Sequence, residues 1–81
     1  MATYEDVLAQ TCEVLARFAK GQPLTEGTRL LADLGLDSVQ AMEILLEAEE
    51  RFDISIPLNV LPSVRTVGDL ARHLQQLVDR A

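Results

Sequence analysis

The sequence has very few of the residues that disulfide frameworks, metal sites and hydrolytic sites require. It contains one cysteine, Cys12, and one histidine, His73, in 81 residues. A single cysteine forms no intramolecular disulfide, and no second cysteine completes a metal site. A serine hydrolase needs a base beside its nucleophile, and His73 is the single histidine that could serve. It falls just outside the apolar stripe of a predicted helix, a position that favours a surface role over a catalytic one. We therefore expect no metal site and no catalytic residue, and the sequence does not predict an enzyme.

Aromatic residues and long apolar runs are also scarce. The chain has no tryptophan, and its aromatic residues are Tyr4, Phe18 and Phe52. Because hydrophobic residues still make up 48% of the chain, the composition indicates a globular domain with a leucine- and valine-rich core. No apolar run approaches the roughly 20 residues that span a bilayer, and the acidic N-terminus lacks a signal-peptide pattern. We expect one soluble, reduced, cytoplasmic domain over residues 1–81, without a transmembrane segment.

Basic residues are nearly absent from the stretch that carries the net charge. Residues 33–53 contain seven acids and Arg51 as their single base, whereas the rest of the chain has six acids and six bases. The net charge of −6 therefore arises within this one stretch. Such a surface repels nucleic acids and anionic lipids and attracts basic protein surfaces. We expect partners with basic patches and no nucleic-acid partner.

The spacing of apolar residues predicts an all-α fold without strands. Apolar periodicity, capping residues and glycine or proline stops predict three main helices, at about 3–19, 38–52 and 66–79. Thr3 is the expected cap of the first, and Thr66 with Asp69 that of the last. On the second helix, the predicted apolar face comprises Ala41, Met42, Leu45, Leu46 and Phe52, with Val39 and Leu46 at its border.

The connections complete a small four-helix bundle with a short third helix and a long first loop. Pro57 and Pro62 leave room for one short helical turn, at about 58–62. Residues 21–36 form the long loop, which Gly21 and Pro23 begin. Its leucines indicate that it packs against the core rather than extending into solvent, and a loop of this length is often functional.

The residues Asp37-Ser38 stand at the start of the second helix. If Asp37 is the N-cap, Gln40 occupies the third helical position and can complete a capping box. Ser38 then takes the first helical position, where its hydroxyl is not needed by the backbone. Free N–H groups and the macrodipole favour an attached anion at that position. The alternative is that Ser38 itself caps the helix, a common role for serine.

The same residues belong to a longer pattern, LGLDSVQAMEILLEAEERFDISIP, followed later by RTVGDLARHL. This pattern resembles the carrier signature of acyl carrier proteins. That signature has a leucine- and glycine-containing approach, Asp-Ser-Leu, an acidic amphipathic helix, an aromatic residue and an Ile-Pro segment. The resemblance covers residues 4–78, and Val39 stands where the family usually has leucine.

The resemblance implies that Ser38 carries a 4′-phosphopantetheine arm, which a phosphopantetheinyl transferase adds from coenzyme A. Asp37 matches the acid before the modified serine. We expect a monomer. The arm's thiol holds an acyl group as a thioester, so the protein is a carrier and its partner enzymes do the chemistry. These partners are acyl-loading enzymes, synthases or acyltransferases with basic patches. The implied docking residues on the second helix are Val39, Glu43, Leu46, Glu47 and Glu50.

Other readings stand beside a stand-alone acyl carrier. Aminoacyl and peptidyl carriers usually have Gly-Gly-His/Asp-Ser, so the Leu-Gly-Leu-Asp-Ser of this chain argues against them. An unmodified helical interaction module would keep the fold without the arm. Met1 and the short tails favour a free protein over an excised synthase domain.

The segment after the Ile-Pro bears on the pathway. Carriers of general fatty acid synthesis usually have acidic residues there, whereas residues 58–64 of this chain are uncharged. We expect at least one apolar side chain of this segment to be exposed near the arm, among Leu58, Val60, Leu61 and Val64. An apolar contact discriminates between partners better than isolated charge pairs do. We therefore expect a specialised lipid or polyketide pathway, with housekeeping fatty acid synthesis as the alternative.

Overall fold

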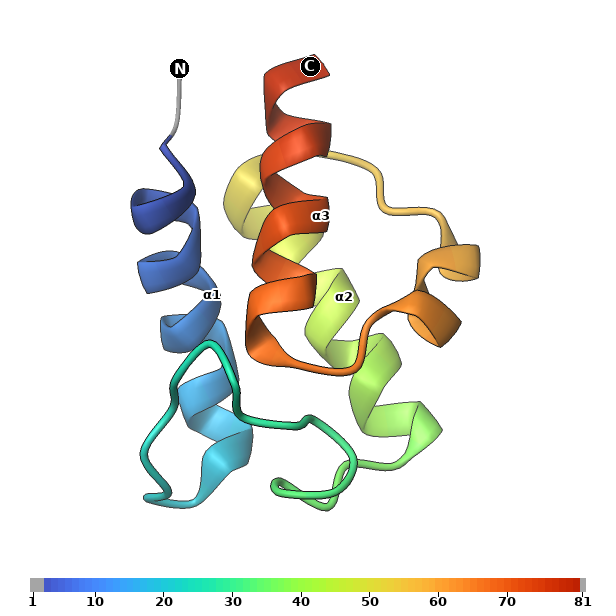
Figure 1. The fold of residues 1–81 in the computed structure, drawn as a ribbon. Coiled ribbons are helices and arrows are strands. Elements are labelled where there is room, and N and C mark those ends of the chain that lie inside the picture. Colours follow the sequence, from blue (N-terminus) through green and yellow to red (C-terminus); the bar gives the residue numbers. More distant parts are fainter. Residues whose placement is uncertain (1–2, 81) are drawn as a thin grey trace.

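The computed structural model describes residues 3–80, apart from the side chains of Leu58 and Leu61. Three α-helices and one short 3-10 helix follow one another along the chain (Figure 1). They are α1 (Tyr4–Ala19), α2 (Ser38–Phe52), η1 (Leu58–Ser63) and α3 (Val67–Arg80). Within the described residues, extended pairing is limited to an isolated antiparallel bridge between Arg29 and Thr66. The predicted all-α fold is confirmed, and the short third helix is a 3-10 helix.

The helix ends follow from local chemistry in the sequence. The side chain of Thr3 accepts a hydrogen bond from the backbone N–H of Asp6 at 3.1 Å, so the predicted cap of α1 is confirmed. α1 ends at Ala19, because Lys20 already adopts the left-handed conformation with φ 52°. The stop therefore begins one residue before the predicted Gly21, which continues the left-handed turn with φ 87°.

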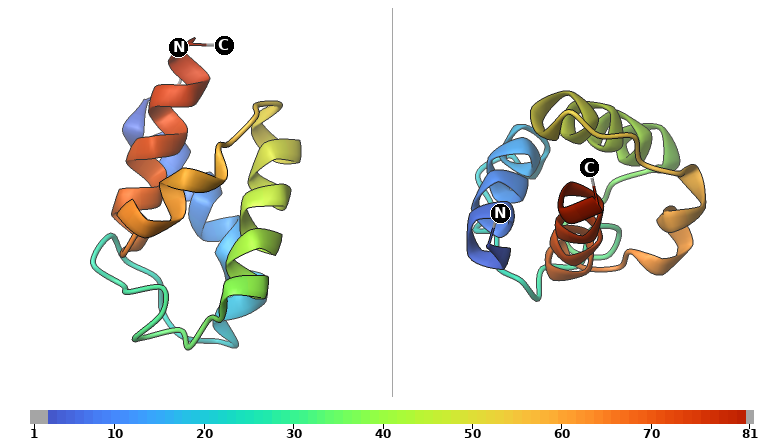
Figure 2. Two further views of the ribbon diagram at one scale, coloured as in Figure 1. Left: turned by 90° about the vertical axis from the view of Figure 1, so that its right-hand side faces the viewer. Right: turned by 90° about the horizontal axis from the view of Figure 1, so that it is seen from above.

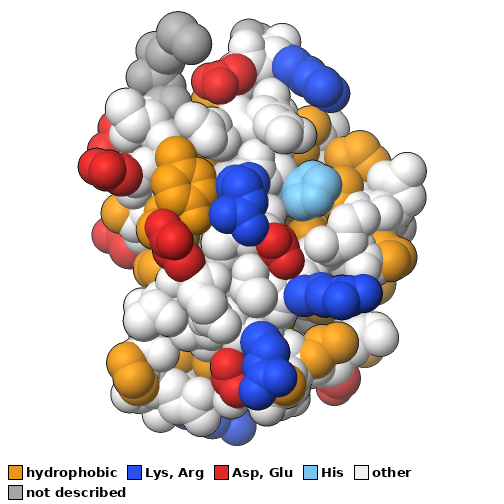
Figure 3. Space-filling model, in the orientation of Figure 1, with side chains coloured by type: hydrophobic (Ala, Val, Ile, Leu, Met, Phe, Trp, Pro, Cys, Tyr) orange, Lys and Arg blue, Asp and Glu red, His pale blue; other side chains and the backbone are white. Residues whose placement is uncertain are grey.

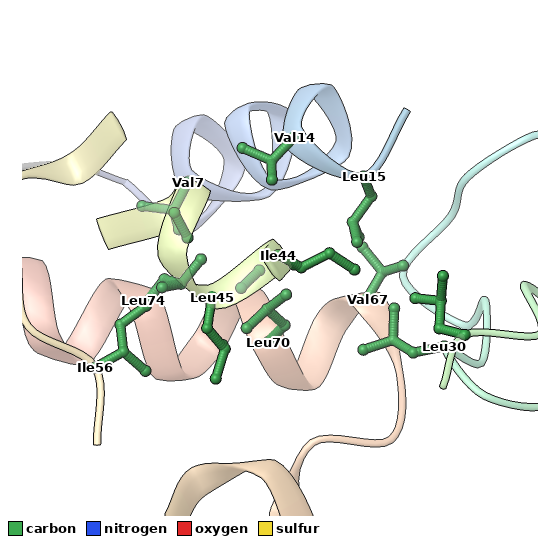
Figure 4. Close-up of a cluster of buried hydrophobic side chains, with 13 residues drawn as sticks. Val7, Val14, Leu15, Leu30, Ile44, Leu45, Ile56, Val67, Leu70 and Leu74 are labelled. Atoms are coloured by element: carbon green, nitrogen blue, oxygen red, sulfur yellow. The ribbon is translucent and has the colours of Figure 1, made fainter. Parts of the chain in front are cut away.

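The core lies where the three α-helices face one another. Seen from above, α1, α2 and η1 are arranged around α3 (Figure 2). Side chains from all three α-helices and from both connecting segments point toward one another in this region (Figure 4). The buried cluster contains Val7, Val14, Leu15, Leu30, Leu36, Ile44, Leu45, Ala48, Ile56, Val67, Leu70, Ala71 and Leu74. Aliphatic packing of this kind is the main stabilising contribution in a domain with few aromatic residues.

Two sequence predictions about burial are wrong in part. On α2, the buried residues are Ile44, Leu45 and Ala48, whereas Met42 is 43% exposed. Leu46, placed within the predicted apolar face and at its border, points outward and is 59% exposed. The reason is that the apolar residues of α2 form one arc covering more than half of the helix circumference, and periodicity alone does not tell which part of this arc meets the core.

The first loop, residues 20–37, is held down by some of its leucines but not by all. Leu30 and Leu36 are buried, and Leu24 and Leu34 pack against the cluster. The prediction that the loop packs against the core is therefore confirmed, although Leu31 is 65% exposed. The hydrogen bond from the N–H of Leu30 to the carbonyl of Arg65, at 2.9 Å, fixes the loop beside the start of α3. This contact positions the approach to Ser38.

Candidate functional site

The start of α2 is defined by a capping box between Asp37 and Gln40. The backbone N–H of Gln40 donates to Oδ1 of Asp37 at 2.8 Å, and the N–H of Asp37 donates to Oε1 of Gln40 at 3.3 Å. Asp37 has the extended conformation of an N-cap, with φ −94° and ψ −178°. The predicted cap is confirmed, and Ser38 is the first helical residue rather than the cap.

The first two N–H groups of α2 remain available to a ligand. Within residues 3–80, neither the N–H of Ser38 nor that of Val39 has a hydrogen-bond acceptor. The side chain of Ser38 is exposed, and the first turn of α2 contains no acidic residue. Unpaired N–H groups at a helix start carry the positive end of the macrodipole. The surroundings of the Ser38 hydroxyl therefore favour an anionic substituent.

A mainly apolar pocket opens beside Ser38. Its volume is about 120 Å³, and it lies between the first loop, α2 and α3. Ser38 is its polar member, and Leu31 lines it from the loop side although most of the Leu31 side chain is exposed. The remaining lining residues are Leu30, Leu36, Ala41, Ile44, Leu45, Val64 and Leu70. A group attached to Ser38 thus has water on one side and an apolar surface on the other.

The side of α2 opposite the core combines apolar and acidic side chains. Val39, Glu43, Leu46 and Glu50 fall within about 60° of one another around the helix axis, and we call them the outer face of α2. Val39 is 64% exposed, and both glutamates are exposed. The structure thus brings together four of the five docking residues expected from the sequence. The fifth, Glu47, lies at the edge toward α1 and is half-buried.

Two exposed leucine-sized side chains near this face were not expected from the sequence. Met42 lies on α2 next to the outer face, and Leu31 lies on the first loop by the pocket. Periodicity assigned Met42 to the core, and Leu31 is one of several leucines in the loop. No signal in the sequence distinguished Met42 from the buried residues of the predicted apolar face.

The acidic stretch is partly neutralised by ion pairs within the fold. Arg17 of α1 pairs with Glu47 of α2 and neutralises it, whereas Arg51, the single base of the stretch, pairs with Glu13 of α1, outside the stretch. Asp33 pairs with Arg29, whose backbone N–H also donates to it and holds the pKa of this carboxyl below its usual range. On the face over α1 and α3, basic and acidic side chains are interspersed (Figure 3). Net negative charge therefore concentrates on α2.

The other chemically active side chains lie apart from this site. Cys12 is half-buried in α1, and burial raises the pKa of its thiol, which lowers its reactivity at neutral pH. His73 is half-buried on α3 beside Asp69 and Arg72. In the described part of the chain, no three metal-ligating side chains gather into a group. Among the same residues, no helix has the length and apolar character needed to cross a membrane.

Comparison with known proteins agrees with this geometry. Residues 5–74 match a family model described as a phosphopantetheine attachment site. A probable acyl carrier protein of Caulobacter vibrioides is 51% identical over 49 residues, which span 60% of this chain and 57% of that protein. The match thus covers little more than half of the Caulobacter protein.

Two further relatives are matched over most of their length. An acyl carrier protein of Phenylobacterium zucineum is 33% identical, over 88% of this chain and 92% of that protein. A meromycolate extension acyl carrier protein of Mycolicibacterium smegmatis is 31% identical, over 94% and 79% respectively. The chain therefore belongs to the acyl carrier protein family, whose members bear a covalent 4′-phosphopantetheine and are carriers rather than enzymes.

Proposed function

We propose that this chain holds acyl intermediates on a 4′-phosphopantetheine arm attached to Ser38 and delivers them to partner enzymes. When bound, the arm supplies a thiol that holds an acyl group as a thioester. The observation that carries the proposal is the capping box, because Asp37 caps the helix together with Gln40, which leaves the Ser38 hydroxyl exposed and not needed as a cap. Asp37 then acts as a positioning residue, since its carboxylate fixes the helix start from which Ser38 projects.

The residues around Ser38 fit a phosphodiester substituent. The unpaired N–H groups of Ser38 and Val39 lie at the positive end of the α2 macrodipole. The adjacent pocket is lined by apolar side chains and does not compete for the hydroxyl. The exposure of Ser38 gives a transferase direct access to its oxygen. These are features of the chain itself and do not depend on the family match.

The outer face of α2 supports docking of basic partners. Glu43 and Glu50 supply exposed charge, and Val39 and Leu46 supply exposed apolar area beside them. Met42 and Leu31 extend the apolar part toward the pocket. Charge on such a face accelerates encounter, and a small apolar centre adds contact area without making the complex long-lived. Phosphopantetheinyl transferases, synthases and acyltransferases with basic patches are the proposed partners.

The proposed pathway is a specialised lipid or polyketide pathway. The uncharged segment from 58 to 64 supports it, as does the relative whose name assigns it to meromycolate extension. Val60 and Val64 are half-buried, while the side chains of Leu58 and Leu61 lie outside the described residues. The predicted apolar side chain near the arm therefore stays a prediction. Complementation of a bacterium lacking its own acyl carrier checks the pathway, because normal growth and normal fatty acids would refute specialisation.

The attachment site is tested by substitution of individual serines. The chain has three serines, and Ser55 is exposed like Ser38 but lies in the connection after α2. After incubation with coenzyme A and a phosphopantetheinyl transferase, intact mass should show one added arm on the wild type and on Ser55→Ala. Ser38→Ala should gain none and should keep its helical circular dichroism. An arm on Ser38→Ala would refute the proposed site.

A further inference from the structure

Among the acids expected to dock partners, Glu47 already has a cationic partner inside the protein. The guanidinium Nη1 of Arg17 donates to Oε1 of Glu47, which joins the last turn of α1 to the middle of α2. The side chain of Arg17 is 72% exposed and that of Glu47 is 30% exposed. Glu43 and Glu50, in contrast, make no ion pair within residues 3–80.

The two arginines that face the gap between α1 and α2 differ in what they neutralise. One surface depression between these helices is lined by Glu13, Val14, Arg17, Glu47, Glu50 and Arg51. Arg51 donates to Glu13 and Gln10, both on α1 and both away from the outer face of α2. Of the two arginines, only Arg17 neutralises an acid at the edge of that face, namely Glu47. The depression also contains Glu50, so the Arg17 charge lies beside an outer-face residue.

We propose that Arg17 is a specificity-determining residue that competes with basic partners for Glu47. This proposal rests on the proposed docking function of α2. An arginine or lysine of a partner that approaches Glu47 is repelled by the Arg17 charge, and it can bind Oε1 only if the Arg17 side chain moves away. Because exposed ion pairs are weak, a partner with a well-placed cation can displace Arg17. Partners that lack a well-placed cation dock more slowly, so Arg17 reduces the binding of weakly basic surfaces.

A purely structural role for the Arg17–Glu47 pair makes a different prediction. If the pair only held α1 against α2, removing Arg17 would lower the melting temperature and leave docking unchanged. If Arg17 competes with partners, its removal strengthens docking through Glu47. The two roles are therefore separated by the KM for the carrier protein measured alongside kcat.

The experiment measures arm transfer to the full chain by a phosphopantetheinyl transferase with coenzyme A. At low salt, Arg17→Ala should lower the KM for the carrier by roughly two- to five-fold, the range that one exposed ion pair allows, with kcat unchanged. This decrease in KM should vanish when Glu47→Gln is also present, and it should become smaller as salt screens the charges.

Two control variants remove a cation elsewhere. Arg80→Ala makes the same change in net charge at the far end of α3, and Arg51→Ala breaks the other ion pair between α1 and α2. Neither should reproduce the decrease in KM. An unchanged or higher KM for Arg17→Ala overturns the inference, as does a gain that survives Glu47→Gln or that Arg80→Ala shares. If the wild type itself receives no arm, the proposed function fails, and the inference fails with it.

Discussion

α2 and α3 begin with the same capping arrangement, yet one helix start is open and the other is closed. Asp37 and Gln40 cap α2, and Thr66 and Asp69 cap α3 in the same reciprocal way. The first residue of α2 is the exposed Ser38, whereas the first residue of α3, Val67, is completely buried. The same reciprocal capping pattern thus occurs at one exposed helix start and at one buried helix start.

The first loop causes the difference. Its carbonyl groups at Glu26 and Thr28 accept hydrogen bonds from the N–H groups of Gly68 and Val67, each at 2.9 Å. No segment within residues 3–80 does this for Ser38 and Val39. The orphan N–H groups of a helix start must find partners in the protein, in water or in a ligand. The loop therefore closes α3 as part of the core and leaves α2 available for chemistry.

Amide hydrogen exchange should show the largest difference between the starts of α2 and α3. The N–H groups of Ser38 and Val39 should exchange faster than those of Val67 and Gly68 by roughly two orders of magnitude or more, because only the latter are bonded and buried. Nuclear magnetic resonance resolves these four amides in one experiment. Equal protection at the two helix starts would remove the basis of the comparison.

Exchanging the first side chains of α2 and α3 should lower the free energy of unfolding by unequal amounts. Val67→Ser places a hydroxyl in the core and removes apolar contacts, so we expect a loss of about 2–4 kcal/mol in the free energy of unfolding. The reverse change, Ser38→Val, should alter stability by less than about 0.5 kcal/mol, because the side chain is exposed. Urea denaturation of both variants measures the difference. Similar costs would mean that the two positions are not packed as described.

Gly68 tests how tightly the loop closes α3. A Cβ at Gly68 would lie 3.1 Å from the carbonyl oxygen of Glu26 and 3.3 Å from the hydroxyl of Tyr4. Although alanine favours helix by about 1 kcal/mol, Gly68→Ala should destabilise the protein by about 1–2 kcal/mol through this crowding. The matched control is Gly27→Ala, whose Cβ meets its nearest atom at 4.0 Å and should cost nothing. A stabilising Gly68→Ala would contradict the close approach.

Acid titration should show a smaller effect at the cap of α3. The guanidinium of Arg72 and the N–H groups of Arg65 and Thr66 hold the pKa of Asp69 below its ordinary value of 3.8. A carboxyl with a lowered folded-state pKa stabilises the fold above 3.8, and this contribution is lost as the pH falls further. The melting temperature of Asp69→Asn should therefore fall less than that of the wild type between pH 4 and 2. If the melting temperatures of the two proteins fell in parallel with pH, the lowered pKa of Asp69 would be contradicted.

The sequence predicted those parts of the site that depend on neighbours along the chain. The spacing of Asp37 and Gln40, and that of Thr66 and Asp69, was enough to place both capping arrangements. Both rest on contacts three residues apart, which helical geometry determines directly. The exposed serine followed from the first of them.

Features that depend on distant contacts were not predictable in this way. The pairing of Arg17 with Glu47 joins residues thirty positions apart, and only the packing of α1 on α2 brings them together. Met42 was assigned to the core because it lies within the broad apolar arc of α2, of which only a part is buried. Which face is buried depends on the position of α3, and this is a property of the whole fold.

The most direct test of this account locates the arm on the wild-type protein. After reaction with coenzyme A and a phosphopantetheinyl transferase, the chain can be cleaved and its peptides fragmented in a mass spectrometer. We predict that the arm lies on Ser38 alone, at the open start of α2, and that Ser55 and Ser63 remain unmodified although both are exposed. An arm on either of those serines, or no arm at all, would contradict the account.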